Sequence, residues 1–509
     1  MSPVAAADAV KRLRAADREI ILLEHTSAIL SWDQETFMPH RAIDERSAQL
    51  SLLQGLIHRR VTDSANEALF EAAGCSAENA EGREDLDAAD RAFLRQAYRR
   101  YRRATRLSQE LVERFAAAAS RGQAVWAAAR AADDFAAFAP QLSELVELQL
   151  EIAERIGYID EPYDALLDQY EPFTLTSDID RAFGELRREL VPLVEAIGSA
   201  PQLDDSVLRR DFPAEQQAAF GDKVMRALGY ELDRGRLDVS AHPFATTLGA
   251  HDVRITTRYN RNFFSSAVFG TIHEVGHALY ELGVAEEYHL SVLGEGTSLG
   301  IHESQSRMWE NMIGRSRHFW EHFYPILLEH FPQSLADIDR EAFYRAINRV
   351  EPSLIRVEAD EVTYGLHVIL RFELERALLN RECTVAQLPE AWRERSRELL
   401  GVVPERDAEG VLQDIHWSMG GMGYFPTYAL GNLYAAQFME TISRDLPTLW
   451  DDVRRGEFSL LLDWLRRNIH IHGRARSARE LCVDITGSEL QAAPFIRYLK
   501  QKYGDLYGI

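Results

Sequence analysis

A long helical pattern is the feature that most limits the folds open to this chain. From residue 90 to 157, apolar residues recur at spacings of three and four, among many Ala, Leu, Arg and Glu residues. These residue types are strong helix formers, and the spacing is typical of a helix with one buried face. We expect breaks at Pro140 and Gly157. The basic run "RRYRRATR" from Arg99 is interpreted as a solvated face paired with acidic residues, with nucleic-acid binding as the alternative.

Two stretches depart from this pattern. Between His242 and Asn260, the β-branched or aromatic residues Val253, Ile255, Thr257 and Tyr259 alternate with polar ones, which predicts a strand. From Asp414 to Leu433, glycines and Pro426 predict a loop rich in aromatic residues, followed by a helix. We find no repeat and no long linker. The sequence therefore predicts one mainly α unit over residues 1–509, with a small sheet and with a groove between two helical halves.

The overall composition restricts partners and compartment. With 80 acidic and 57 basic residues the formal net charge is −23, so the surface should repel nucleic acid and anionic membranes. Only three cysteines are present, Cys75, Cys383 and Cys482, and they are far apart, which favours a reducing cytoplasm. The N-terminus lacks the apolar core of a signal peptide, and no stretch reaches the roughly 20 apolar residues of a membrane span.

The stretch "FGTIHEVGHALYELG" carries the main chemical signal. On a helix, His273 and His277 lie one turn apart and face the same way, so both imidazoles can bind one zinc ion. Glu274 can reach a water on that ion without being a ligand, as a general base does. Gly283 is a plausible end for this helix. The alternative is a helix that contains two histidines without a metal.

A third ligand is available in a second predicted helix that begins at Gly300. Glu303 follows His277 by 26 residues, across a glycine-containing segment that can turn the chain back. Two histidines and a glutamate form a set of zinc ligands that leaves one position for water. His302 is the competing candidate for this ligand.

Motifs along most of the chain resemble those of the carboxypeptidase Taq family of zinc metallocarboxypeptidases. They are "SWDQETFMP" (Ser31–Pro39), "HPF" (His242–Phe244), "DVRIT" (Asp252–Thr256), "HEVGH" (His273–His277), "HESQ" (His302–Gln305), "IRVEAD" (Ile355–Asp360), "GVLQDIHW" (Gly410–Trp417) and "NIHIHG" (Asn468–Gly473). One departure is visible after "MP", where the family usually has proline and glycines and this chain has "HRAIDER". That departure concerns a local loop.

This resemblance implies a homodimeric, mainly helical peptidase with a deep groove over the metal and a small sheet next to the histidine helix. It implies the release of single residues from free peptide C-termini with broad specificity, and it favours Glu303 over His302 as the third ligand. Zinc is the expected ion, and cobalt can replace it. The resemblance also gives Arg254 and Arg356 the task of meeting the substrate carboxylate, to which a guanidinium can donate two parallel hydrogen bonds. The alternative for each arginine is an ion pair with Asp252, Glu358 or Asp360.

Stabilisation of the oxyanion requires a hydrogen-bond donor besides the metal. His416 and Tyr424 are the candidates in the glycine-rich loop, and Tyr428 is a further one because it resembles a tyrosine of more distant helical zinc peptidases. Packing in the core is the alternative for both tyrosines, and it is our interpretation of Trp32, Trp126 and Trp417. Two other functions remain open for the chain, a metallo-endopeptidase on a related fold and a non-catalytic scaffold. The presence of Glu274 argues against the scaffold.

Overall fold

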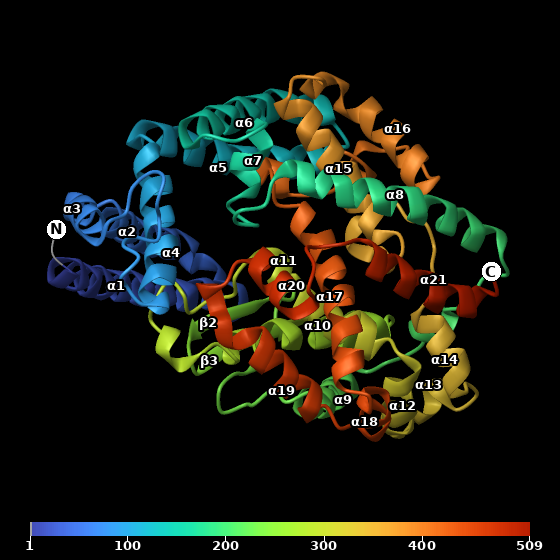
Figure 1. The fold of residues 1–509 in the computed structure, drawn as a ribbon. Helices are drawn as coiled ribbons and strands as arrows, with labels where there is room; N and C mark the ends of the chain where they lie inside the picture. The colour runs from blue at the N-terminus through green and yellow to red at the C-terminus, as the bar shows by residue number, and fades with distance from the viewer. Residues whose placement is uncertain (1–2) are drawn as a thin grey trace.

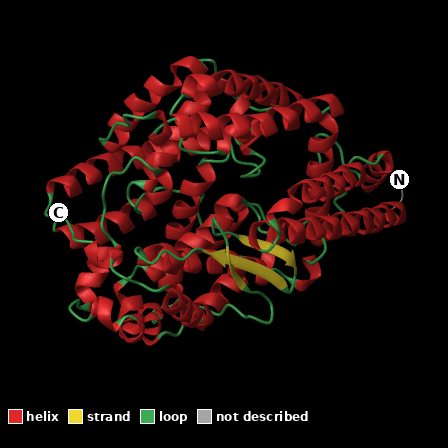
Figure 2. Cartoon of the chain, turned by 180° about the vertical axis from the view of Figure 1, so that it is seen from behind, coloured by secondary structure: helices red, strands yellow, loops and turns green. Residues whose placement is uncertain are grey.

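The computed structural model describes residues 3–509, which form a mainly helical molecule with one small sheet (Figure 1 and Figure 2). The N-terminal helices project from one side of the molecule in Figure 1. They are α1 (Pro3–Thr36), α2 (Ile43–Val61), α3 (Ser64–Ala73) and α4 (Ala88–Arg106). They pack around two small apolar clusters apart from the main core, and one of these clusters also includes Val292 and Leu293.

The remaining helices share one large apolar core, which runs from Leu111 to Tyr507. The helices at the top of Figure 1 are α5 (Gln109–Ala132), α6 (Phe135–Ile156), α7 (Pro162–Leu167), α8 (Thr176–Ser199), α15 (Tyr364–Leu379) and α16 (Leu388–Leu400). Those in the lower part are α9 (Ala214–Ala227), α10 (Phe264–Leu282), α11 (Leu299–Arg307), the π-helix η4 (Met308–Gly314), α12 (Arg317–His330), α13 (Pro332–Leu335), α14 (Arg340–Ile347), α18 (Leu449–Arg455), α19 (Ser459–Asn468) and α20 (Ala478–Thr486). Two long helices, α17 (Pro426–Asp445) and α21 (Ala493–Tyr507), lie between these groups.

The sheet has three strands in the order β1-β3-β2. β1 (Leu237–Val239) pairs with β3 (Asp252–Thr257) in parallel, and β2 (Ala245–Gly249) pairs with β3 in antiparallel. Val253 and Ile255 on the central strand are fully buried, and β3 packs against α10. The predicted strand is confirmed, but it ends at Thr257, and Tyr259 lies in the segment that leads to a turn at residues 261–262. The sheet therefore supports the helix that carries the two histidines.

The helical character of residues 90–157 was correctly predicted, but the break expected at Pro140 was wrong. The chain is interrupted at Ser108 and at Asp134, whose side chains cap the next helix by accepting from backbone N–H groups. Pro140 lies inside α6. A proline there loses one backbone hydrogen bond, but the cap at Asp134 and the buried apolar face of α6 outweigh that loss. Gly157 ends α6 as expected.

The basic run on α4 pairs with acidic residues, as expected from the sequence. Arg99 contacts Asp168 at 2.7 Å, and Arg100 contacts Glu24 at 3.1 Å. All three cysteines are free thiols. Among residues 3–509, no helix has the length and apolar character needed to cross a membrane.

Candidate metal centre

The helix α10 holds the two histidines between the sheet and α11. Its side chains are buried on most sides, and Gly283 follows its last residue, as predicted. The closeness of α10 to α11 depends on Gly276, since a Cβ there would lie 2.6 Å from the Cα of Ser306. Gly431 has the same role on α17, where a Cβ would lie 2.4 Å from the Cγ of Glu303. Two glycines therefore let α11 lie closely against both neighbouring helices.

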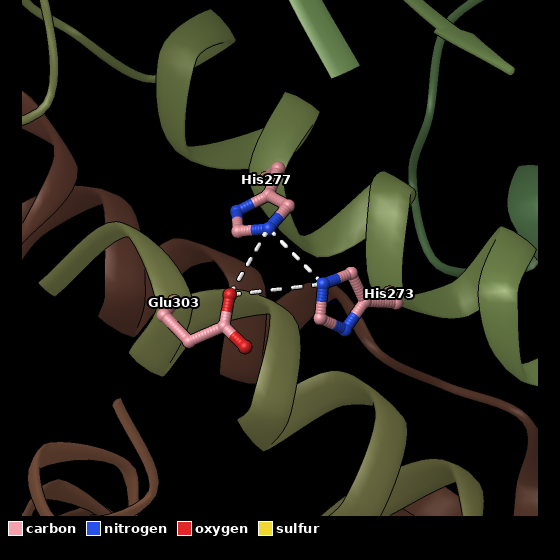
Figure 3. Close-up of side chains that lie close together, drawn as sticks. All are labelled: His273, His277 and Glu303. Carbon is pink, nitrogen blue, oxygen red and sulfur yellow. Dashed lines mark hydrogen bonds and ion pairs between the residues drawn. The ribbon is translucent and has the colours of Figure 1, made fainter. Parts of the chain in front are cut away.

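Three side chains converge where α10 and α11 meet (Figure 3). The Nε2 atoms of His273 and His277 are 3.2 Å apart, and Oε2 of Glu303 lies 3.7 Å from the first and 3.5 Å from the second. Ligands at 2.0–2.1 Å in tetrahedral geometry are separated by about 3.3 Å. The three atoms therefore fit a single divalent ion.

Each member of this triad is oriented by a second hydrogen bond. Nδ1 of His273 lies 2.9 Å from Oε2 of Glu310, and Nδ1 of His277 lies 3.1 Å from the backbone oxygen of His302. Because a carboxylate and a carbonyl only accept, each Nδ1 carries the proton and each Nε2 presents a lone pair. Burial lowers the pKa of His277 to about 3, which keeps the imidazole neutral as a ligand must be.

Arg307 and Glu310 complete the charges around the triad. Nε of Arg307 donates to Oε1 of Glu303 at 2.7 Å, and its NH1 group contacts Glu310 at 3.2 Å. Burial would raise the pKa of Glu303, but the Arg307 guanidinium holds it well below its usual range. Sequence analysis missed both residues. Their spacing from Glu303, four and then three residues, places all three on one helix face and could have revealed them.

His302 points away from the triad, in contrast to the alternative considered from the sequence. Its Nε2 contacts Glu281 at 2.8 Å, and its ring stacks on that of His277 with centroids 4.4 Å apart. Glu274 is 7% exposed, and burial raises its pKa to about 7. A carboxyl group with such a pKa can exchange a proton near neutral pH.

The glycine-rich loop brings His416 next to both candidate tyrosines. Nε2 of His416 lies 3.2 Å from the hydroxyl of Tyr428, and the rings of Tyr424 and Tyr428 have centroids 5.2 Å apart. Burial lowers the pKa of His416 to about 4, so this imidazole is neutral at pH 7. Burial and the neighbouring Glu303 carboxylate both raise the pKa of Tyr424, which keeps its hydroxyl protonated. Since the charge of Glu303 acts on both Tyr424 and Tyr428, these protonated hydroxyl groups lie near the triad as hydrogen-bond donors.

A buried carboxyl group that sequence analysis missed holds this loop in place. Glu375 on α15 accepts from the indole of Trp417 at 2.8 Å and from the backbone N–H of Gly423 at 3.1 Å. Trp417 is buried, as expected for a core residue. Nothing in the local sequence pattern pairs Glu375 with a loop some 40 residues later, so this contact required the fold.

Arg356 lies in a buried charge cluster with a partner that the sequence did not suggest. Its Nε and NH2 groups donate to Oδ1 of Asp414 at 3.0 and 2.9 Å. Arg371 contacts the other oxygen of the same carboxylate at 2.6 Å. Two guanidinium groups therefore share one carboxylate, and the guanidinium of Arg356 also lies 4.8 Å from the ring centre of Tyr428. The cluster keeps an excess positive charge beside His416 and Tyr428.

Arg254 forms an ion pair with Asp252, which was the alternative to a role in substrate binding. It contacts Asp252 through two hydrogen bonds of 2.8 and 2.7 Å, and its guanidinium lies 4.2 Å from the ring centre of Trp32. The structure thus brings Arg254 together with Asp252 and α1, whereas it brings Arg356 together with His416 and Tyr428.

Comparison with known proteins agrees with this geometry. The family model described as carboxypeptidase Taq (M32) metallopeptidase matches residues 12–503. The chain belongs to this family. It is therefore a metal-dependent carboxypeptidase, a hydrolase of peptides, and the resemblance seen in the sequence motifs is confirmed.

Relatives and solved structures match along nearly the whole chain. Thermostable carboxypeptidase 1 of Thermus thermophilus is 43% identical over 100% of both chains, and carboxypeptidase 1 of Bacillus subtilis is 39% identical over 94% of this chain and 95% of its own. The crystal structure of the M32 carboxypeptidase from Deinococcus radiodurans superposes with a TM-score of 0.95 at 40% identity, over 99% of this chain and 100% of that one. Pyrococcus furiosus carboxypeptidase superposes with a TM-score of 0.93 at 39% identity, over 97% and 99%. The M32 fold is thus shared from end to end.

Proposed function

We propose that His273, His277 and Glu303 hold the catalytic ion, that this ion is zinc, and that cobalt can replace it. The observation that carries the proposal is the triangle of 3.2, 3.5 and 3.7 Å between their ligand atoms. Two nitrogens and one oxygen are a donor set typical of catalytic zinc sites, which keep one position open. When bound, the ion polarises the peptide carbonyl and makes a water molecule more acidic.

Glu274 is the general base in this proposal. It lies about 100° further round α10 than His273, and the charges of His273 and Glu303 both act on its carboxyl group. Its closeness to the triad supports this role. The burial that raises its pKa to about 7 lets it accept a proton from the attacking water and pass it to the leaving amine near neutral pH.

His416, Tyr424 and Tyr428 stabilise the negative charge that develops on the carbonyl oxygen. Their support is the hydrogen bond between His416 and Tyr428, the closeness of the two tyrosine rings and the protonated hydroxyl groups. Donors that are already in position cost little reorganisation during the reaction.

Arg356 binds the terminal carboxylate of the substrate. The excess positive charge that Arg356 and Arg371 keep beside Asp414 supports this role, since a second carboxylate would balance it. Arg254 is the second candidate, although Asp252 already neutralises it. Specificity for the last side chain is broad, as the resemblance implies.

A homodimer in the cytoplasm completes the proposal, with residues 1–509 forming one catalytic unit. Several large apolar side chains are exposed on α1, α2 and the turn between them, namely Leu22, Ile29, Phe37, Ile43 and Leu52. Apolar side chains exposed in such number on neighbouring elements support an interface there. Light scattering should show a particle of twice 57.9 kDa, and a monomer at working concentration would contradict the dimer. The free cysteines support the reducing compartment.

Peptides of defined termini test the proposed activity. N-blocked peptides with free or amidated C-termini are incubated with the enzyme, with and without chelator, and the products are identified by mass spectrometry. We expect single residues to leave only the free acids, and activity to depend on zinc or cobalt after verified metal loss. Internal cleavage, or equal cleavage of amidated peptides, would favour an endopeptidase.

A further inference from the structure

An apolar cavity of about 570 Å³ lies beside the loop that carries the proposed oxyanion donors. His416 and Tyr424 form part of its wall, so the cavity adjoins the proposed catalytic site. The wall also includes residues from the end of α4 and from α5 and α6, and the last two helices lie side by side at the top of Figure 1. Its apolar lining consists of Leu107, Leu111, Val112, Phe115, Ile152 and Met419.

Part of this apolar lining is open to solvent. Val112 is 39% exposed and Met419 is 40% exposed, although both line a concavity. Apolar surface in a hollow favours a ligand that removes it from water. The volume lies within the roughly 300–1,000 Å³ range of pockets for small ligands, and it can hold a large side chain with part of its backbone.

One arginine in the lining is held by neutral acceptors, with Asp168 acting on its charge only from beyond ion-pair distance. Arg103 donates to the backbone oxygen of Ala165 at 3.1 Å and to Oε1 of Gln169 at 2.9 Å, and within residues 3–509 no carboxylate forms an ion pair with it. Arg99, one turn earlier, pairs with Asp168. Burial lowers the pKa of Arg103, and the nearby Asp168 offsets only part of this shift. Its remaining N–H groups are available to an oxygen atom of a ligand.

The position of Arg356 indicates which part of a peptide reaches the cavity. Arg356 does not belong to the lining, whereas His416 and Tyr424 do. A peptide whose terminal carboxylate contacts Arg356 and whose last amide bond lies at the triad must extend its N-terminal part in another direction. The cavity adjoins that same site and offers an apolar wall for this part.

We propose that the cavity is a subsite for a large apolar side chain on the N-terminal side of the scissile bond, with Arg103 donating to a carbonyl oxygen of the same peptide segment. This assignment rests on the proposed function, because it takes the orientation of the peptide from the carboxylate at Arg356. It predicts a preference for a large apolar residue before the scissile bond, in addition to the broad specificity for the last residue.

A cavity-filling variant tests the subsite. Val112→Trp fills the space from α5, and Glu113→Trp adds the same side chain at the neighbouring exposed position as a matched control. The substrates are N-acetylated alanine pentapeptides with Phe or Gly at each position in turn. For the wild type we expect kcat/KM to be about tenfold or more higher with Phe than with Gly at one position before the scissile bond, as burial of an aromatic ring implies. Val112→Trp should remove this preference and leave the Gly peptides unchanged, while Glu113→Trp should retain it.

A second variant keeps the test valid if Val112→Trp misfolds. Arg103→Met keeps an apolar stem and removes the donors, so KM should rise about tenfold for pentapeptides, as loss of a charge-assisted hydrogen bond implies, and hardly at all for blocked dipeptides. A Phe preference confined to the last residue, or no preference at any position, overturns the subsite. In either case the wild type would still release C-terminal residues. Failure of that release would overturn the proposed function instead.

Discussion

The metal-binding helices and the loop from Asp414 to Tyr428 face the same site, but their polar groups are held in different ways. In α11 and η4, Glu303, Arg307 and Glu310 bind one another within a single helix face. In the loop, the partners come from elsewhere, such as Glu375 on α15 for Trp417 and Gly423. The helices themselves therefore supply most of the side chains that orient the metal ligands, whereas the position of the loop depends on tertiary packing. Substitutions should accordingly affect metal binding and substrate recognition separately.

The largest effect is expected for Glu274→Gln, which removes the proposed base on the helix side. The amide keeps the shape of the carboxylate but cannot accept the proton, so kcat should fall by roughly 10²–10⁴. Metal content, measured by atomic emission after dialysis, should stay at the wild-type value. A variant with bound metal and near-normal turnover would show that Glu274 is not the base.

Arg356→Met removes the proposed anchor on the loop side. Loss of a charge-assisted hydrogen bond to the substrate should cost about 1.5–3 kcal/mol, which is roughly ten- to more than a hundredfold in kcat/KM for free-acid peptides. Amidated peptides should be poor substrates for the wild type, and Arg356→Met should lower their kcat/KM little further. Arg254→Met is the matched comparison. If only the Arg254 variant loses the discrimination, the anchor is Arg254, and the proposed role of Arg356 is wrong.

Glu310→Gln weakens the hydrogen bond that orients His273 without touching the substrate. Loss of such an outer partner typically lowers metal affinity by about 10–100-fold. Competition with a chelator measures this affinity directly, and Glu287→Gln at an exposed position serves as the control. Glu310→Asp should recover part of the affinity. Unchanged metal affinity in the Glu310→Gln variant would show that η4 does not contribute to metal binding.

The smallest effect concerns Glu171, which lies next to the start of α11. Its buried carboxylate accepts from the backbone N–H of Gly300, at the start of α11, and from the hydroxyl of Ser298. Burial raises its pKa to about 7 in the folded state, above the ordinary value of 4.5 for a glutamate. Between these pH values the folded protein binds more protons than the unfolded chain, so stability should fall as pH rises, by up to about 1.4 kcal/mol per pH unit from this group.

Glu171→Gln should remove that slope. The difference between wild type and variant in the free energy of unfolding is measured by urea titration at several pH values from 4.5 to 7. The contributions of other buried carboxyl groups to the pH dependence are the same in both proteins, so they cancel in this difference. A difference that does not vary with pH would show that Glu171 does not change its protonation on unfolding.

The same contrast explains how much the sequence could predict. His273 and His277 follow from helical spacing, and the strand before them follows from alternation. Spacing left Glu303 and His302 as alternatives, and the resemblance in the motifs favoured Glu303. Arg307 and Glu310 could have been found by extending the helix face from Glu303. The partner of Arg356 could not have been found in this way, because Asp414 is 58 residues away in the chain. The two side chains meet only through the packing of α15 against the loop. Pro140 was mistaken for a break because the cap at Asp134 and the buried face of α6 outweigh the lost hydrogen bond.

The position of the ion tests the central claim most directly. Crystals of the zinc-loaded enzyme are measured on both sides of the zinc absorption edge, which locates zinc by its anomalous signal. We expect one strong peak per chain at about 2.0–2.2 Å from Nε2 of His273, Nε2 of His277 and a carboxylate oxygen of Glu303. A peak coordinated by His302 instead of Glu303, or no zinc at this triad in an active enzyme, would contradict the account.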